Sequence, residues 1–359
     1  MAFHVDYSFL DRVIHRIAFV SPAVQLTAAD IEELVFASAY REVTISKPVF
    51  ITSLPRAGTT VLLDAVSQLP SVCTHLYRDM PFVLAPMFWA RLSGPFRRRA
   101  EVRERAHADG VLVSEDSPEA FEEVLWRALW PQRYRRDRIE LWSVEDCTAD
   151  ARAQFLEHMR KIIALRRPDY ASDRRYASKN NANIARLSLL CRMFADARIV
   201  VPIRHPLQHA RSLLRQHRNF LALHAQEAFA RRYMEDIGHY EFGQLHRPIG
   251  FPGLDALIGG RSPLTLDYWL GYWIAAFEHV WYHRAIIIPI SYEALCARPQ
   301  AVFGNLLEQL SIVADDRSVD TAAARFSLPA ERPSDDHPDD ELLRRAERLH
   351  QRLVNASLE

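Results

Sequence analysis

The sequence predicts a three-layer α/β/α domain with a central parallel sheet and helical insertions. Short apolar segments rich in β-branched residues alternate along the chain with longer segments of helical periodicity, which is the pattern of βαβ units. Two of the apolar segments, 48–53 and 197–204, lack alternating polar residues, as is typical of strands that helices cover on both faces. No internal repeat is visible in the 359 residues. We therefore expect a single domain over 1–359.

Capping residues and apolar stripes indicate several helices in the first half of the chain. Thr27 is placed to cap a helix, with Asp30 in a capping-box-like position. Apolar residues after Gly58 fall on one stripe of a helix that follows the first strand. Ser117 and Pro118 suit a cap and a first helical position. In this half we predict strands at 48–53 and 72–76 and helices at 27–38, 58–69, 81–92, 97–106, 117–130 and about 150–166.

The second half continues the alternation of strands and helices. The apolar segment ARIVVPIR runs straight into a helix that begins at Pro206, and a long aromatic helix precedes a further apolar strand. Five of the eleven glycines and three prolines fall within 242–264, a composition that favours a loop or lid. We predict strands at 175–179, 197–204 and 285–291, helices at 183–194, 206–219, 265–284, 299–311 and 338–354, and a polar loop between the last two helices.

Charge and cysteine usage argue against several classes of protein. Lys plus Arg and Asp plus Glu each number 45, so the formal net charge is zero, which gives no bulk attraction to nucleic acid or to an anionic membrane. The four cysteines form no CxxC pair, so neither a disulfide framework nor a metal site is indicated. No signal peptide and no apolar run of about 18 residues is present. We expect a cytoplasmic protein without a membrane span or a metal, and the oligomeric state stays open.

The stretch LPRAGTT at 54–60 has the chemistry of an anion-binding loop. It joins a strand to a helix, and the N–H groups and dipole at a helix start both favour bound anions. Gly58 allows close backbone approach, Thr59 and Thr60 supply hydroxyl donors, and Arg56 supplies a cation. The GxxxxGK[ST] pattern of ATPases and GTPases does not fit, because both its first glycine and its lysine are missing.

A second strand end repeats this arrangement. Arg204 ends the strand at 197–204, and Ser212 follows eight residues later in the next helix. In a parallel sheet the carboxyl ends of the strands meet at one edge, so both side chains can reach a single phosphate there.

Together the two motifs resemble those of sulfotransferases that use 3′-phosphoadenylyl sulfate (PAPS), with most similarity to the bacterial and tyrosylprotein-type members. The resemblance covers about 48–79, 175–220 and 285–311. It implies a P-loop-NTPase-like fold with PAPS as co-substrate. The segment SYEAL resembles the family's YEDL segment, and this resemblance leaves two roles open for Tyr292, contact with the nucleotide or packing alone. The residues implied to bind the donor are Arg56, Ala57, Gly58, Thr59 and Thr60 for the 5′-phosphosulfate, Arg204 and Ser212 for the 3′-phosphate, and Tyr292.

The sequence departs from the family pattern at two positions. Ala57 stands where many members have serine, which removes one hydroxyl donor from the loop. His205 replaces the aspartate that is common after the arginine, and we expect this change to affect loop packing.

The resemblance also suggests residues for the chemistry. Asp79 in HLYRDMP is the carboxylate nearest the position of the family's base, and His75 is the alternative because histidine titrates near neutral pH. Lys179, one of three lysines, resembles a family lysine that faces the bridging oxygen, where a compact charge suits the leaving group. Arg56 would act in catalysis as well as in binding.

The leading hypothesis is a PAPS-dependent sulfotransferase that acts on a small-molecule, lipid or carbohydrate acceptor. A small-molecule kinase and a non-catalytic nucleotide-binding protein are the alternatives. We expect N-terminal helices over 1–46, a nucleotide-binding core over 48–220 and 285–311, and helical insertions on the acceptor side over 80–170 and 221–284. The aromatic helix at 265–284 lines either an acceptor pocket or the core.

Overall fold

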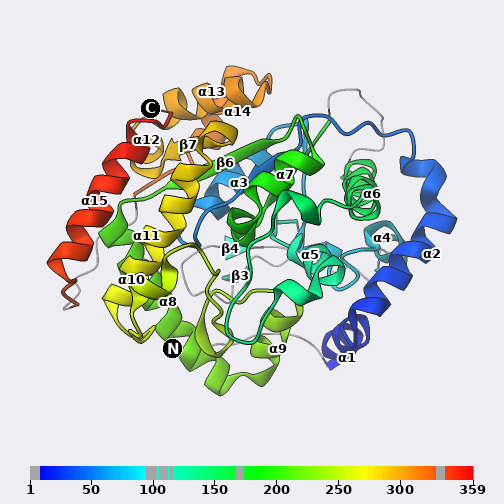
Figure 1. Ribbon diagram of the computed structural model, residues 1–359. Coiled ribbons are helices and arrows are strands. Elements are labelled where there is room, and N and C mark those ends of the chain that lie inside the picture. Colours follow the sequence, from blue (N-terminus) through cyan, green and yellow to red (C-terminus); the bar gives the residue numbers. More distant parts are fainter. Residues whose placement is uncertain are drawn as a thin grey trace.

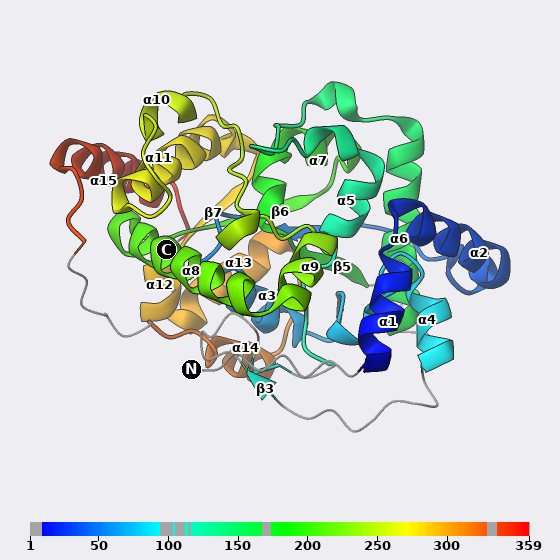
Figure 2. The same cartoon turned by 90° about the horizontal axis from the view of Figure 1, so that it is seen from below.

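A parallel five-stranded sheet lies at the centre of the molecule, with helices on both faces (Figures 1 and 2). The computed structural model describes residues 9–93, 103–104, 112–113, 116–166, 174–328 and 336–358. The strands are β1 (Val49–Ile51), β2 (Val72–Cys73), β5 (Arg175–Lys179), β6 (Arg198–Ile203) and β7 (Ile288–Ser291), in the order β2-β5-β1-β6-β7. The predicted α/β/α class is confirmed, and all five predicted strands are present.

Strand register brings the last residues of β1 and β5 together beside the middle of β6. Ile51 of β1 lies beside Lys179 of β5 and Val200 of β6. Because all neighbouring pairs are parallel, the loops that follow β1, β5, β6 and β7 leave from the same edge. Ligand sites of open parallel sheets form at this edge.

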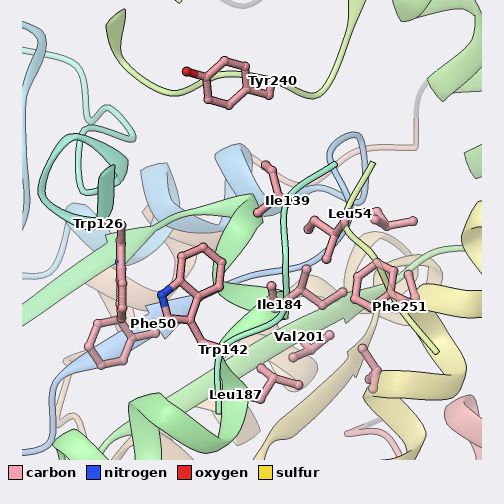
Figure 3. Packing of buried hydrophobic residues seen from close by; sticks show 14 of the residues in the cluster. Phe50, Leu54, Trp126, Ile139, Trp142, Ile184, Leu187, Val201, Tyr240 and Phe251 are labelled. Carbon is pink, nitrogen blue, oxygen red and sulfur yellow. The ribbon is translucent and has the colours of Figure 1, made fainter. Parts of the chain in front are cut away.

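Alternate residues of the strands build two hydrophobic cores. Phe50 faces a core that also contains Trp126 and Trp142 (Figure 3), whereas Val49 and Ile51 face the core on the other side of the sheet. Side chains alternate between faces along a strand. Both faces are therefore covered by apolar packing, which explains why the strand segments carry no polar alternation.

The helices connect and cover the strands as the alternation predicts. Helix α3 follows β1, helix α8 follows β6 and helix α12 follows β7. None of the described helices is long and apolar enough to cross a membrane. The helices are α1 (Phe9–Ala18), α2 (Pro22–Tyr40), α3 (Thr59–Ser67), α4 (Pro86–Ser93), α5 (Glu123–Leu129), α6 (Ala149–Arg166), α7 (Leu187–Met193), α8 (Pro206–Gln226), α9 (Ala228–Asp236), α10 (Leu254–Ile258), α11 (Leu266–Tyr282), α12 (Tyr292–Ala297), α13 (Pro299–Leu310), α14 (Asp316–Ala323) and α15 (Asp340–Val354).

Several predicted boundaries are wrong. The helix expected over 117–130 begins only at Glu123, because the backbone of Ser117 and Glu119 is hydrogen-bonded to the segment after β2. The helix expected over 81–92 begins at Pro86. The polar stretch expected to be a loop contains α14, which Asp315 caps by accepting a hydrogen bond from the Ser318 N–H at 2.8 Å.

Two further predictions concern the glycine-rich stretch 242–264 and the charged stretch 97–106. The glycine-rich stretch 242–264 is mostly loop, and it contains the short helix α10. The helix expected over 97–106 falls largely outside the described residues. Its described part forms strand β3 (Arg103–Glu104), which pairs in antiparallel fashion with β4 (Leu112–Val113).

Candidate functional site

The loop after β1 turns sharply into α3 and lies against the start of α12. Gly58 is the N-cap of α3 and has φ +91°, and Arg56 has φ +74°. A Cβ atom on Gly58 would lie 2.5 Å from a ring carbon of Tyr292, well inside the ~3.5–4.0 Å at which carbon atoms pack. The first turn of α3 has N–H groups without helical partners, so the loop and the helix start together favour an anion.

The structure brings the two predicted donor-binding motifs together. The Arg56 Nε lies 3.4 Å from the Ser212 Oγ, and the Arg204 Nη1 donates a hydrogen bond to the Arg56 carbonyl oxygen at 3.0 Å. The Arg204 guanidinium also lies 5.4 Å from the centre of the Tyr292 ring. Four residues, from the connections that follow β1, β6 and β7 and from the helices that begin there, thus lie close together at the carboxyl edge of the sheet.

The electrostatics of this point favour an anion. Burial lowers the pKa of Arg204, which is only 8% exposed, and the neighbouring Arg56 guanidinium lowers it further. Burial and the charge of Arg204 lower the pKa of His209 to about 3, so this imidazole is neutral and its Nε2–H donates to the Pro55 carbonyl oxygen at 2.8 Å. A bound anion would relieve the repulsion between the two guanidinium groups.

Polar contacts join the phosphate loop to the loop after β5. The Thr59 hydroxyl donates to the Asn181 Oδ1 at 3.2 Å, and the Asn181 Nδ2 donates to the Glu241 Oε1 at 3.1 Å. Ala57 is fully buried and Thr60 is half-buried at the start of α3. Many family members have serine at the position of Ala57, and the methyl group of Ala57 is well suited to this buried position.

Lys179 ends β5 at the same edge and lines a narrow cavity. The cavity has a volume of about 30 Å³ and adjoins the phosphate loop through Pro55. Helix α11 contributes Trp269 and Tyr272 to its wall, although most of this helix is core. The lining also includes Ala120, Glu123, Ile139, Asn181, His239, Tyr240, Glu241 and Arg247.

Asp79 and His75 lie in a separate buried cluster and are not among the cavity-lining residues. The Arg166 guanidinium pairs with the Asp79 carboxylate, and the His75 Nδ1 lies 3.3 Å from it. Burial acts to raise the pKa of Asp79, but His75 and Arg166 outweigh it and lower this pKa to about 2. On its other side the His75 Nε2 lies 2.8 Å from the His158 Nε2. These contacts are those of a structural ion-pair cluster.

The family comparison matches the part of the chain that carries this geometry. A model described as the sulfotransferase family covers residues 48–247, more than half of the 359-residue chain. The chain belongs to the sulfotransferase family. Membership makes it a transferase of sulfuryl groups. The tyrosylprotein-type branch stays a prediction, and no curated protein sequence matches this sulfotransferase significantly.

Solved sulfotransferase structures are similar at low sequence identity. Sulfotransferase STF1 of Mycobacterium tuberculosis is 13% identical, with 97% of this chain and 87% of that chain covered and a TM-score of 0.47. Sulfotransferase STF9 of Mycobacterium avium gives 13% identity, 98% and 86% coverage and a TM-score of 0.46. A sulfotransferase of Alicyclobacillus acidocaldarius gives 11% identity, 87% and 97% coverage and a TM-score of 0.42. At these values the likenesses carry no inference about substrate or mechanism.

A buried polar network in this sulfotransferase supports the loop after β5. The Arg186 guanidinium makes two hydrogen bonds of 2.7 Å to the Glu123 carboxylate and stacks between Trp126 and Trp142, 4.4 and 4.0 Å from their ring centres. The Asn180 Nδ2 donates to the same carboxylate at 2.7 Å. This network fixes the residue that follows Lys179, and no sequence motif indicated it.

Glu119 is a second residue that the sequence did not single out. It is half-buried, and its Oε1 accepts a hydrogen bond of 2.7 Å from the N–H of Ala120, a cavity-lining residue. Burial acts to raise the pKa of Glu119, but the charges of Lys179 and His239 and a hydrogen bond with Tyr77 lower it. The sequence signal was misleading, because SPE was assigned to the start of a helix.

Metal binding has no evident place in the described part of the sulfotransferase. Its described residues contain no group of three or more His, Cys, Asp or Glu side chains placed to hold a metal ion.

Proposed function

We propose that this sulfotransferase moves the sulfuryl group of PAPS to a hydroxyl group of a small-molecule acceptor by in-line displacement. An amine is the lesser alternative, and a lipid or carbohydrate would fit the same chemistry. The observation that supports the proposal is the meeting of Arg56, Arg204 and Ser212 at the start of α3, with Lys179 at the end of the adjacent strand. Two cationic groups at one sheet edge suit a ligand with phosphate at both ends.

Each donor-binding residue has a role that its position supports. Arg56 and the N–H groups at the start of α3 would hold the 5′-phosphosulfate, with the hydroxyls of Thr59 and Thr60 as further donors. Arg204 and Ser212 would hold the 3′-phosphate, since guanidinium groups bind phosphate oxygens in pairs. Tyr292 would pack beside the nucleotide, as it already packs beside Gly58 and Arg204.

Lys179 would stabilise the charge that develops on the leaving oxygen. Its backbone pairs with Ile51 at the end of β1 and it lines the cavity, a position that supports this role. Transfer needs the attacking oxygen, the sulfur and the bridging oxygen roughly in line. The cavity of about 30 Å³ has room for little more than one water-sized group, so an acceptor would have to displace its walls, which include Tyr240, Trp269 and Tyr272.

Nucleotide binding separates the proposal from the kinase alternative. Isothermal titration should show that adenosine 3′,5′-bisphosphate binds without added metal and more tightly than ATP. The variant Arg204→Met should weaken this binding by about 10-fold or more, since a hydrogen bond to a charged group contributes ~1.5–3 kcal/mol. Tighter binding of ATP with Mg²⁺ would contradict the proposed donor.

Turnover separates the proposal from a non-catalytic nucleotide-binding protein. Incubating the enzyme with PAPS and a cell extract should yield products that mass spectrometry detects by the added sulfuryl group. Lys179→Ala should keep the affinity for adenosine 3′,5′-bisphosphate but lose turnover. Binding without transfer by the unmodified enzyme would favour the non-catalytic alternative.

A further inference from the structure

Exposed apolar side chains are concentrated on the two helices α1 and α2. Fourteen large apolar residues are exposed in the described part of the molecule, and half of them fall within residues 9–35. The two helices contact each other and lie on the same side of the molecule (Figures 1 and 2). Single exposed apolar residues are common on protein surfaces, whereas a concentration of them marks an interaction site. The α1–α2 face consists of Phe9, Leu10, Ile17, Val20, Ile31, Leu34 and Val35.

Helix α1 turns a polar side toward the molecule and an apolar side toward solvent. Its buried residues are His15 and Ala18, and the His15 Nε2 lies 3.0 Å from the Asp236 Oδ2. At about 3.6 residues per turn, Leu10 and Ile17 lie on the other side of the helix, where they are exposed. A surface helix of a globular protein normally turns its apolar side toward the core. The apolar side of α1 is therefore directed at something outside its own subunit.

Helix α2 has the same inverted orientation. Its buried side carries Glu32 and Tyr40, and the Glu32 Oε2 accepts a hydrogen bond from the Phe88 N–H at 2.6 Å. Ile31 and Leu34 lie on the other side of the helix, and Leu34 is 87% exposed. Two successive helices thus place satisfied polar groups inside and aliphatic side chains outside.

The exposed apolar area is that of a protein–protein interface. Fully exposed aliphatic and aromatic side chains offer on the order of 100 Å² each. The residues of the α1–α2 face are 47–87% exposed, so together they present roughly 500 Å² of apolar surface. A stable interface buries about 800 Å² per partner, of which ~56–65% is apolar. The α1–α2 face therefore supplies about the apolar area that one side of such an interface needs.

Charges beside this face are complementary to a second copy of themselves. Asp30 and Arg41 are both exposed, and Arg41 continues α2 with helical backbone angles. Eleven residues make almost three whole turns, so the two side chains lie on the same side of α2, about 16 Å apart along its axis. If two α2 helices pack in antiparallel fashion about a two-fold axis near Val35, Asp30 of each copy meets Arg41 of the other. The symmetry makes this contact twice.

The same charges argue against a lipid surface as the partner. The exposed charged residues within 9–41 are three basic and three acidic, and none of the basic ones is lysine. Helices that bind anionic membranes carry an excess of Lys and Arg beside their apolar side. A balanced set of charges instead suits a protein surface of equally balanced charge.

We propose that the α1–α2 face is a homodimer interface in which α2 packs in antiparallel fashion against α2 of a second copy. Ile31, Leu34 and Val35 form its apolar centre, and the exposed residues of α1 extend it. Burial of these side chains removes apolar surface from water, which drives the association. The two Asp30–Arg41 pairs set the antiparallel direction. This inference goes beyond the proposed function and does not depend on it.

The test measures the mass of the 359-residue protein by sedimentation velocity, from concentrations below micromolar to well above it. The variant Leu34→Glu places a charge in the centre of the interface and keeps a good helix former. Val313→Glu is the matched control, because Val313 is 88% exposed and lies outside the α1–α2 face. The variants Asp30→Arg and Arg41→Asp, alone and combined, test the antiparallel direction. Circular dichroism and thermal unfolding show that each variant is folded.

The unmodified protein should sediment as a dimer at micromolar concentration. Leu34→Glu should raise the dissociation constant of the dimer by about 30-fold or more, as the loss of a central apolar contact does, whereas Val313→Glu should leave it unchanged. Asp30→Arg and Arg41→Asp should each raise it by about 10-fold, because each turns two attractive pairs into repulsive ones. The combined variant should regain most of the affinity, because the pairs are then restored with their charges exchanged.

Four outcomes would overturn the proposal. They are an unmodified protein that stays monomeric throughout, a dimer that Leu34→Glu leaves intact, and a combined charge variant that dimerises no better than the two single variants. The fourth is a monomer that binds vesicles of phosphatidylcholine and phosphatidylglycerol and loses this binding in Leu34→Glu, which would assign the α1–α2 face to a lipid surface instead.

Discussion

Replacing Gly58 by alanine tests whether the turn into α3 needs both its left-handed backbone and its close contact with Tyr292. Residues other than glycine lose about 1–2 kcal/mol in this conformation. The new methyl carbon would also start 2.5 Å from a ring carbon of Tyr292, so the ring or the loop must move by about 1 Å to reach normal packing distance. Since Tyr292 contacts Arg204, that movement would disturb the proposed 3′-phosphate site as well.

The expected effect of Gly58→Ala is twofold. The free energy of unfolding should fall by about 1–3 kcal/mol, the range of a strained residue. The affinity for adenosine 3′,5′-bisphosphate should fall by about 10-fold or more, which corresponds to ~1.4 kcal/mol of binding free energy. In a Tyr292→Ala background, Gly58→Ala should lower the free energy of unfolding by less, because the overlap of the new methyl group with the tyrosine ring is removed while the backbone strain stays.

Denaturant unfolding and calorimetric titration measure both effects. Gly304→Ala is the matched control, because Gly304 lies within α13 and a Cβ atom there would meet nothing within 4 Å. Alanine should stabilise that helix by about 0.5–1 kcal/mol. If Gly58→Ala unfolds and binds nucleotide as the unmodified protein does, the reasoning about the turn is wrong.

Three other predictions concern the buried clusters and the donor site. Asp79→Asn should lower the free energy of unfolding at neutral pH. Because the pKa of Asp79 is lowered to about 2, its stabilising contribution is fully present above its unfolded pKa of about 3.9 and is lost as the pH falls through 2. The free energies of unfolding of the two proteins should therefore converge in acid, and a difference that stays constant with pH would contradict this. Glu123→Gln should lower the free energy of unfolding by about 3–5 kcal/mol, because it leaves the Arg186 charge buried without its partner. Denaturant titration should show a smaller loss for the apolar double variant Glu123→Leu/Arg186→Met. Ser212→Ala should weaken binding of adenosine 3′,5′-bisphosphate by about 10-fold but leave binding of adenosine 5′-phosphate unchanged, and equal losses for both nucleotides in titration would argue against contact with the 3′-phosphate.

The sequence by itself predicted the sheet, its layers and the two anion-binding motifs. Strand β1 and the part of β6 after Arg198 contain only apolar residues, and the helix that follows each of them has its own periodicity, so these elements are encoded locally. The loop at Arg56 and the strand end at Arg204 are also local features. Parallel strand order then brings them together, which the 3.0 Å contact between Arg204 and the Arg56 carbonyl confirms.

Only the tertiary structure decided which partners these acidic side chains meet. Asp79 was the nearest carboxylate in sequence, but Arg166 from α6 pairs with it in a buried cluster. Glu119 was assigned to a helix start, yet a hydrogen bond from its N–H to the His75 carbonyl oxygen holds it in an extended segment before α5. Both outcomes depend on partners far away in the chain, and the periodicity of a segment carries no information about which distant backbone or charge will meet it.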